Sequence, residues 1–252
     1  MTDRRESMSS AIVVTSGKGG TGKTSVTAGV ACCLAAMGHR VLCIDMDVGL
    51  RNLDLSLGMS DRALMDFTDV VEGRCPLDRA AVEHSRIPGL FLLSAPMTHH
   101  PIDAAGMKAL ISEAKKSFQY ILLDSPAGLG EDFRLAVAAA DRAFVVSTTD
   151  PSALRDAQRT VGELRRTLPD RIHLVMNRIQ PKLLKKLHTD IDTAMDTAGL
   201  PLIGVVPEDP SVILAAGSGT PLIAYTRKNA AAAYYNIARR LTGQRVPVLK
   251  MK

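Results

Sequence analysis

The sequence has few aromatic residues and no tryptophan. Only 4% of its 252 residues are Phe, Trp or Tyr, whereas 46% are hydrophobic. A core built from aliphatic side chains and Met is typical of a parallel sheet covered by helices. The charged fraction of 23% and the net charge of +5 are ordinary for a globular protein. No run of basic residues marks a nucleic-acid face, so we do not expect nucleic acid as a partner.

Cysteine motifs are missing as well. The four cysteines are Cys32, Cys33, Cys43 and Cys75, and no two of them form a C-x-x-C pair. This spacing excludes the common zinc sites and argues against a scaffold for metal clusters. We interpret the thiols as small apolar side chains in a reducing compartment.

The chain also lacks long apolar runs. Its first ten residues, MTDRRESMSS, are polar and contain no signal-peptide core. No apolar stretch approaches the roughly 18 residues that a membrane-spanning helix needs. We therefore expect a cytoplasmic protein, or one that binds peripherally at the inner face of the cell membrane.

Short apolar runs that alternate with helical patterns predict the fold. Strands are predicted at Ala11–Thr15, Val41–Asp45, Leu90–Ser94, Tyr120–Asp124, Ala143–Ser147, Ile172–Asn177 and Leu202–Val206. Helices are predicted at Thr24–Met37, Ala104–Ser117, Pro151–Leu168 and Asn229–Leu241. Wholly apolar strands separated by helices indicate an α/β fold, in which helices flank both faces of a mostly parallel, twisted sheet.

The chain shows no repeat, no low-complexity linker and no shift in composition. We predict a disordered N-terminus over residues 1–10, a single domain over 11–243 and a short basic and apolar tail over 244–252. In open α/β sheets, ligands bind beyond the carboxyl ends of the strands. The functional residues are therefore expected just after the predicted strands.

A phosphate-binding loop follows the first predicted strand. The segment from Gly17 to Thr24 matches G-x-x-x-x-G-K-[ST] and opens the first predicted helix. Its glycines let backbone N–H groups surround phosphate oxygens, and the helix N-terminus adds partial positive charge. Lys23 can reach the β- and γ-phosphates, and the Thr24 hydroxyl can bind Mg²⁺. The residues predicted to contact ATP here are Gly17, Lys18, Gly19, Gly20, Thr21, Gly22, Lys23, Thr24 and Ser25.

Aspartates end two of the predicted strands. Asp45 and Asp47 lie at and just beyond the end of the second strand, and Asp124 ends the fourth. We predict that Asp124 holds Mg²⁺ through one of its waters and that Asp47 orients or activates the attacking water. Aspartates at strand ends are also common turn and cap residues. A purely structural role therefore remains an alternative for these aspartates, most of all for Asp45.

Several motifs together resemble the MinD/ParA family of deviant Walker A ATPases. KGGTGKT carries the extra lysine of that family, at Lys18. The segments DMDVGLRNLDLSLG, DSPAGLGEDF, TDPSALRDAQRTVG and GVVPEDP are similar to the MinD branch, whereas the D-x-D-P-Q-G pattern of ParA proteins is absent. The similar segments extend from Ala11 to about Thr242.

The resemblance implies a cycle of ATP binding, dimerisation and hydrolysis. The catalytic residues would be Lys18, Lys23 and Asp47, and Lys18 would act on the nucleotide of a second subunit. Adenine would lie near Asn177, Arg178, Pro207, Glu208 and Asp209. No N-K-x-D motif follows the strand that ends at Asn177, so ATP is favoured over GTP. A MinC-like inhibitor and a MinE-like activator follow from the resemblance, as does a role in positioning the division septum.

The tail departs from the MinD pattern. Its last residues, GQRVPVLKMK, contain Pro247 and are too short for a basic amphipathic helix. Basic and apolar side chains could still bind an anionic membrane surface weakly, and two tails in a dimer would bind more tightly. The alternatives are a ParA-type or flagellar-number-regulator ATPase that positions DNA or another cargo, and a metabolic ligase or kinase.

Overall fold

A computed structural model describes residues 9–60, 64–98, 102–186 and 190–249. Its centre is one eight-stranded sheet in the order β3-β4-β2-β5-β1-β6-β7-β8. The strands are β1 Ser10–Thr15, β2 Val41–Asp45, β3 Val82–Glu83, β4 Leu90–Leu93, β5 Tyr120–Asp124, β6 Arg142–Ser147, β7 Ile172–Ile179 and β8 Leu202–Pro207. All neighbouring pairs are parallel except β3 with β4.

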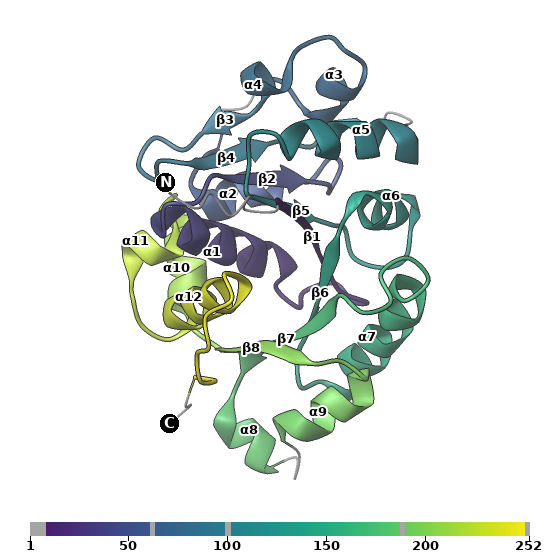
Figure 1. Cartoon of the computed structure of the whole chain (residues 1–252). Helices are drawn as coiled ribbons and strands as arrows, with labels where there is room; N and C mark the ends of the chain where they lie inside the picture. The colour runs from purple at the N-terminus through teal and green to yellow at the C-terminus, as the bar shows by residue number, and fades with distance from the viewer. Residues whose placement is uncertain (1–8, 61–63, 99–101, 187–189, 250–252) are drawn as a thin grey trace, which may run out of the picture.

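Helices cover both faces of this sheet (Figure 1). One face is covered by α1 Lys23–Ala36, α2 Asn52–Leu57, α10 Ser211–Gly217, α11 Leu222–Tyr225 and α12 Ala230–Leu241. The other face is covered by α3 Phe67–Val71, α4 Leu77–Ala80, α5 Ala104–Ala114, α6 Glu131–Ala139, α7 Pro151–Leu164 and α9 Ile191–Ala198. The helix α8 Pro181–Lys186 follows β7. The predicted fold class, a single α/β domain with a mostly parallel sheet between helices, is confirmed.

Each predicted strand and helix is present, and the differences lie at ends and in short elements. The helix predicted to reach Leu168 ends at Leu164, because the residues after it form a turn in which Thr167 donates to the Leu164 carbonyl. The antiparallel β3 and the short helices α2–α4, α6 and α8–α11 were not predicted. Most of them have fewer than nine residues, too few for a clear periodic pattern.

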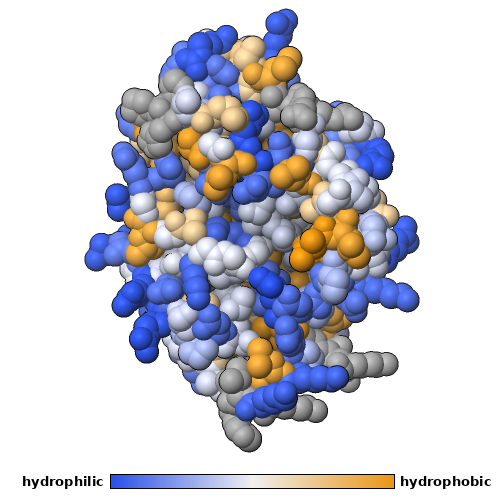
Figure 2. Space-filling model, turned by 180° about the vertical axis from the view of Figure 1, so that it is seen from behind, coloured by the Kyte–Doolittle hydropathy of each residue, from blue (hydrophilic) through white to orange (hydrophobic). Residues whose placement is uncertain are grey.

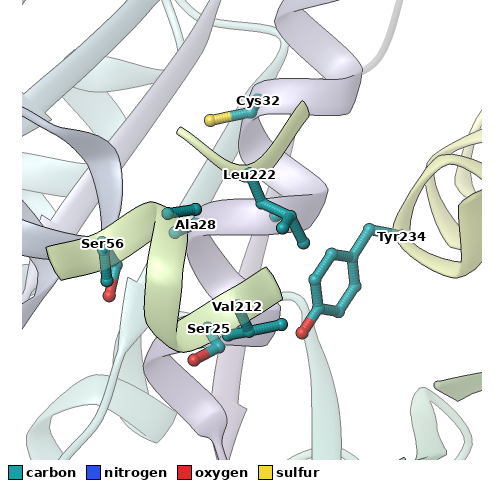
Figure 3. A pocket seen from close by; sticks show the side chains of 10 residues that line it. Ser25, Ala28, Cys32, Ser56, Val212, Leu222 and Tyr234 are labelled. Carbon is teal, nitrogen blue, oxygen red and sulfur yellow. The ribbon is translucent and has the colours of Figure 1, made fainter. Parts of the chain in front are cut away.

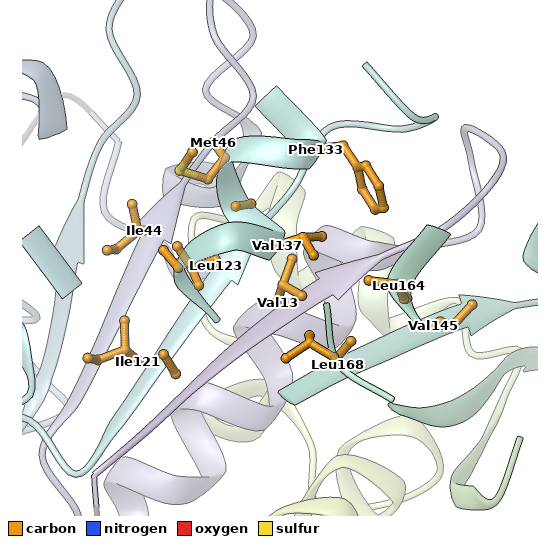
Figure 4. Close-up of a cluster of buried hydrophobic side chains, with 14 of the residues drawn as sticks. Val13, Ile44, Met46, Ile121, Leu123, Phe133, Val137, Val145, Leu164 and Leu168 are labelled. Atoms are coloured by element: carbon orange, nitrogen blue, oxygen red, sulfur yellow. The ribbon is translucent and has the colours of Figure 1, made fainter. Parts of the chain in front are cut away.

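Apolar side chains from strands and helices fill the space on each face. On one face, Val13, Ile44 and Leu123 of neighbouring strands meet Phe133 and Val137 of α6 (Figure 4). All five of these side chains are buried. Because β1, β2 and β5 lie side by side in the middle of the sheet, the loops that follow them are held on a rigid base.

Close contact between α1 and α12 fixes the first helix on the other face. A Cβ added to Gly29 would lie 2.1 Å from the Tyr234 ring, so the absence of a side chain permits this packing. Figure 3 shows Tyr234 directed toward a small cavity that is also lined by Ser25, Val212 and Leu222. Its volume of about 30 Å³ is enough for roughly one water molecule.

The C-terminal tail lies against the domain as far as the structure describes it. The Arg240 guanidinium donates to the Val246 carbonyl at 3.0 and 3.1 Å and to the Ile203 carbonyl at 2.6 Å. Leu249 packs against the core of the α1 and α12 face. The described part of the tail is therefore held against the domain by Arg240 of α12 and by the packing of Leu249.

The surface is mixed in character. Figure 2 shows apolar side chains in separate patches among hydrophilic ones on the face that it presents. Within the described residues, no helix combines the length and the apolar character needed to cross a membrane.

The contact between Gly29 and Tyr234 gives a stability prediction. Gly29→Ala should lower the free energy of unfolding by about 1–3 kcal/mol, because the new methyl group overlaps the aromatic ring. Gly162→Ala in α7 is the matched control, since its new methyl group meets no atom within 4 Å. The control should gain about 0.5–1 kcal/mol from the higher helix propensity of alanine. Urea unfolding of both variants measures the difference, and equal effects would contradict the packing argument.

Candidate nucleotide-binding site

The phosphate loop connects β1 to α1 at the carboxyl edge of the sheet. Gly20 and Gly22 have positive φ angles of 79° and 90°, a conformation that disfavours residues with a side chain. A Cβ on Gly17 would lie 2.3 Å from the Asp156 carbonyl oxygen of α7. Backbone conformation therefore favours glycine at positions 20 and 22, and close packing requires it at position 17.

Two residues of β7 hold the loop from one side. The Asn177 side-chain amide donates to the Thr21 carbonyl at 2.7 Å, and a Cβ on Gly22 would collide with that amide. The Arg178 guanidinium donates to the Gly20 carbonyl at 3.2 Å and pairs with Glu208 at 3.0 Å. Both residues, predicted to contact adenine, thus bind the phosphate loop itself.

Lys23 is the first residue of α1 and is nearly buried. Burial lowers the pKa of its ammonium, although the charges of Asp124 and Asp47 oppose this shift. A cation in such a position is stabilised by a further anion, and a phosphate group meets that requirement. The structure therefore brings together Lys23, Asp47 and Asp124, as the sequence predicts.

Asp124 is buried at the end of β5, beside Val14 of β1 and Asp45 of β2 in the sheet pairing. Burial raises the pKa of its carboxyl to about 7, while hydrogen bonds from the Thr24 and Thr27 side chains oppose the rise. A carboxylate and a threonine hydroxyl this close together are suitable oxygen donors for Mg²⁺ and its waters.

Asp45 and Asp47 differ in their surroundings. Asp45 accepts hydrogen bonds from the Asp47 amide at 2.9 Å and the Leu53 amide at 3.1 Å, so it shapes the loop that leads to α2. Burial raises the pKa of the Asp45 carboxyl to about 6. Asp47 is partly exposed, and burial raises the pKa of its carboxyl while nearby Lys23 opposes the shift. Of the three aspartates at the ends of β2 and β5, Asp47 is the one that reaches solvent.

Lys18 lies on the rim of the loop and turns toward the start of α7. Its ammonium is 3.0 Å from an Asp150 carboxylate oxygen and 2.8 Å from the Ser152 hydroxyl. Nearly half of each charged side chain is exposed, 45% for Lys18 and 47% for Asp150. An exposed ion pair of this kind contributes only about 0–1 kcal/mol, so Lys18 is free to exchange partners at little cost.

A cavity of about 310 Å³ opens beside the loop. Its lining includes residues 18–21 of the loop, Arg178 and Glu208. The cavity is therefore adjacent to the phosphate loop.

Other residues predicted to contact the nucleotide lie outside this cavity. Asp209 accepts from the Ser211 and Ala230 amides at 2.9 and 3.2 Å, Pro207 pairs with Ile179, and Ser25 lines the small cavity near Tyr234.

The site has further features that fit a bound nucleotide and its metal. The Thr21 hydroxyl is buried without a hydrogen-bond partner, and Gly19 and Gly20 face open space. Within the described residues, no group of three or more His, Cys, Asp or Glu side chains could hold a metal ion alone. The adjacent residues His99 and His100 lie outside the described residues. The donor set of Thr24 and Asp124 therefore suits a metal that also binds phosphate oxygens.

Sequence reasoning missed three polar residues of this site. Thr27 donates to Asp124, and Asp150 and Ser152 bind Lys18. The sequence offers one signal for the role of Thr27, its position one helical turn after Lys23. Asp150 and Ser152 begin a helix far from the loop in the chain, so only the fold brings them near Lys18.

The raised pKa of Asp124 gives a pH-dependent prediction. The folded protein binds this proton more tightly than the unfolded chain, whose carboxyl has a pKa near 3.8. The contribution to stability is therefore full below about pH 4 and is lost as the pH rises through about 7. Asp124→Asn should raise the melting temperature of the nucleotide-free protein at pH 8, and less at pH 5. The melting temperature should rise by about 2–4 °C for each kcal/mol of stability gained when the charge is no longer buried.

Asp190→Asn serves as the control for this measurement. Hydrogen bonds from Thr193 lower the pKa of the Asp190 carboxyl, so the replacement should bring no gain at pH 8. Scanning calorimetry across the pH range compares both variants with the wild type. A gain for Asp124→Asn that does not grow with pH would contradict the prediction.

Comparison with known proteins identifies the family. The profile of the CobQ/CobB/MinD/ParA nucleotide binding domain matches residues 12–222. The septum site-determining protein MinD of Synechocystis sp. is 41% identical over 246 residues, which cover 96% of this chain and 92% of that protein.

Two solved structures agree with this result. The MinC:MinD cell division protein complex of Aquifex aeolicus superposes with a TM-score of 0.90 at 37% identity, covering 96% of this chain and 99% of the other. MinD of Pyrococcus horikoshii in complex with Mg-ADP gives a TM-score of 0.81 at 30% identity, covering 93% and 96%. The chain therefore belongs to the MinD branch of the CobQ/CobB/MinD/ParA family, as a Mg²⁺-dependent ATPase of the type that determines the septum site.

Proposed function

We propose that ATP binding converts this chain into a homodimer in which Lys18 of each subunit reaches the nucleotide of the other. The observation that carries the proposal is the position of Lys18. Its ammonium binds Asp150 and Ser152 on the rim of the site, and the side chain is half exposed. A second subunit facing the carboxyl edge of the sheet would meet this lysine first.

Within each subunit, the remaining residues have separate roles. Lys23 binds the terminal phosphates, and the backbone of the loop surrounds them. Thr24 and Asp124 would hold Mg²⁺, which would supply positive charge beside the phosphate oxygens. Asp47 orients the attacking water, because it is the partly exposed carboxylate near Lys23. Lys18 of the partner offsets the charge that develops during phosphoryl transfer.

The base and ribose occupy the cavity beside the loop. Arg178 and Glu208 line it and contact the nucleotide directly. Asn177 supports them from beneath the loop, while Pro207 and Asp209 shape the turn after β8. The other residues predicted to contact ATP, including Ser25, lie in the loop and in the first turn of α1.

The dimer then presents a surface for partners. The relative in Aquifex aeolicus is described in a complex with MinC, and a MinC-like inhibitor is the partner we propose here. A MinE-like activator would stimulate hydrolysis and separate the subunits. The tail would bind an anionic membrane surface at the inner face of the cell membrane, after Arg240 releases the Val246 carbonyl.

The position of Lys18 leads to a kinetic prediction. Lys18→Ala should bind ATP with nearly unchanged affinity, yet lose dimerisation and at least about 100-fold of its hydrolysis rate, since one charge-stabilising donor is worth that much. Equilibrium dialysis, light scattering with ATP and phosphate release measure the three properties. Lys115→Ala, which breaks a 2.7 Å ion pair with Asp141, is the control and should resemble the wild type. Full turnover by a monomeric Lys18→Ala protein would exclude the mechanism in trans.

The tail gives a second prediction. Removal of Arg245–Lys252 should reduce the ATP-dependent sedimentation of the protein with anionic liposomes, because it removes three basic and four apolar side chains. The control is the same pair of proteins with ADP and with neutral liposomes, where little of either should sediment. Equal sedimentation of both forms with ATP would refute membrane binding by the tail and leave the ATPase cycle untouched.

A further inference from the structure

Thr27 lies beneath the proposed magnesium site, outside the phosphate-loop motif. It is fully buried on α1, with no exposed surface. Its hydroxyl oxygen is 2.9 Å from an Asp124 carboxylate oxygen and 3.0 Å from the Lys23 carbonyl oxygen. The side chain therefore touches both the backbone of the lysine that begins α1 and the aspartate that ends β5.

The Thr27 hydroxyl has one proton and two acceptors within reach. A hydrogen bond to a carboxylate is stronger than one to a neutral carbonyl, so the proton goes to an ionised Asp124. The branched side chain has only two common χ1 rotamers in a helix, and Thr27 is fully buried. The hydroxyl is thus a fixed donor that points at one carboxylate oxygen.

A fixed donor restricts the Asp124 carboxylate. The group cannot rotate about its Cβ–Cγ bond without losing the hydrogen bond from Thr27. Without that donor, the carboxylate could turn toward Lys23, whose charge attracts it. Bidentate or water-mediated contact with a metal needs carboxylate oxygens in a defined orientation, and residues that bind a ligand group indirectly often supply it.

We propose that Thr27 is a positioning residue for Mg²⁺ binding, acting through Asp124. The proposal rests on the assignment of Asp124 and Thr24 to Mg²⁺ in the proposed function. Thr27 does not touch the nucleotide or the metal. It holds the carboxylate in the orientation that the metal and its waters require.

The test measures how much Mg²⁺ strengthens ADP binding. Calorimetric titration gives the ADP dissociation constant with Mg²⁺ and with EDTA, and their ratio is the Mg²⁺ gain. Thr27→Val keeps the shape of the side chain and removes the donor. Its Mg²⁺ gain should fall by about 10-fold or more, the effect of losing a hydrogen bond to a charged group. Its affinity for ADP in EDTA should stay at the wild-type value.

Two further variants separate positioning from a general loss of structure. Thr27→Ser keeps the hydroxyl and should keep most of the Mg²⁺ gain. Thr160→Val removes another fully buried hydroxyl, which donates to the Asp156 carbonyl four residues earlier at 2.9 Å and not to a carboxylate. This matched control should keep the whole gain, whatever its effect on melting temperature.

The outcomes distinguish this inference from the proposed function. A Thr27→Val protein with the wild-type Mg²⁺ gain would overturn the role of Thr27 alone. A wild-type protein without any Mg²⁺ gain would overturn the assignment of the metal site itself. Should Thr27→Val fail to fold, Thr27→Ala replaces it beside Thr27→Ser, and an equal gain in those two variants would refute the inference.

Discussion

Charge burial at the carboxyl edge of the sheet is the constraint on which the site depends. Asp45 and Asp124 lie side by side at the ends of β2 and β5, with Lys23 close to Asp124. An isolated buried charge is costly, so each of these groups needs partners. Backbone amides donate to Asp45, the Thr27 hydroxyl donates to Asp124, and the charges of Asp124 and Asp47 offset part of the cost of burying Lys23. Burial of Lys23 is the part of this cluster that the carboxylates offset only partly, since the pKa of its ammonium is still lowered.

The rest of the fold keeps these groups from moving apart. The loop is fixed from β7 by Asn177 and Arg178 and from α7 by the close approach at Gly17. The first helix is fixed by Tyr234 of α12, which fills the space above Gly29. Asp209 joins the turn after β8 to the first residue of α12. The phosphate loop, the cavity beside it and the last helix thus form one continuous set of contacts, and Arg240 extends it to the tail.

Much of this arrangement is predictable from the sequence, and the limits have physical reasons. The seven parallel strands and four long helices follow from apolar runs and periodicity. Lys23, Asp47 and Asp124 follow from the rule that ligands bind beyond the carboxyl ends of parallel strands. The partners of Lys18 and the hydroxyl of Thr27 could not be predicted, because those contacts join residues 97 to 134 positions apart. Asn177 and Arg178 were predicted near the base, whereas their polar groups are bound to the loop backbone, which no sequence pattern reveals.

The distribution of thiols has a practical consequence. Cys32, Cys33 and Cys43 are buried, and burial raises the pKa of each thiol, so none is readily available as a thiolate. Cys75 alone of the four reaches solvent, in a groove that it shares with Arg40 and Phe118 at the amino ends of β2 and β5. That groove lies at the sheet edge opposite the phosphate loop. Although burial also raises the pKa of the Cys75 thiol, its exposure makes it the cysteine of this sequence that a fluorophore or spin label reaches most readily, at a position away from the phosphate loop.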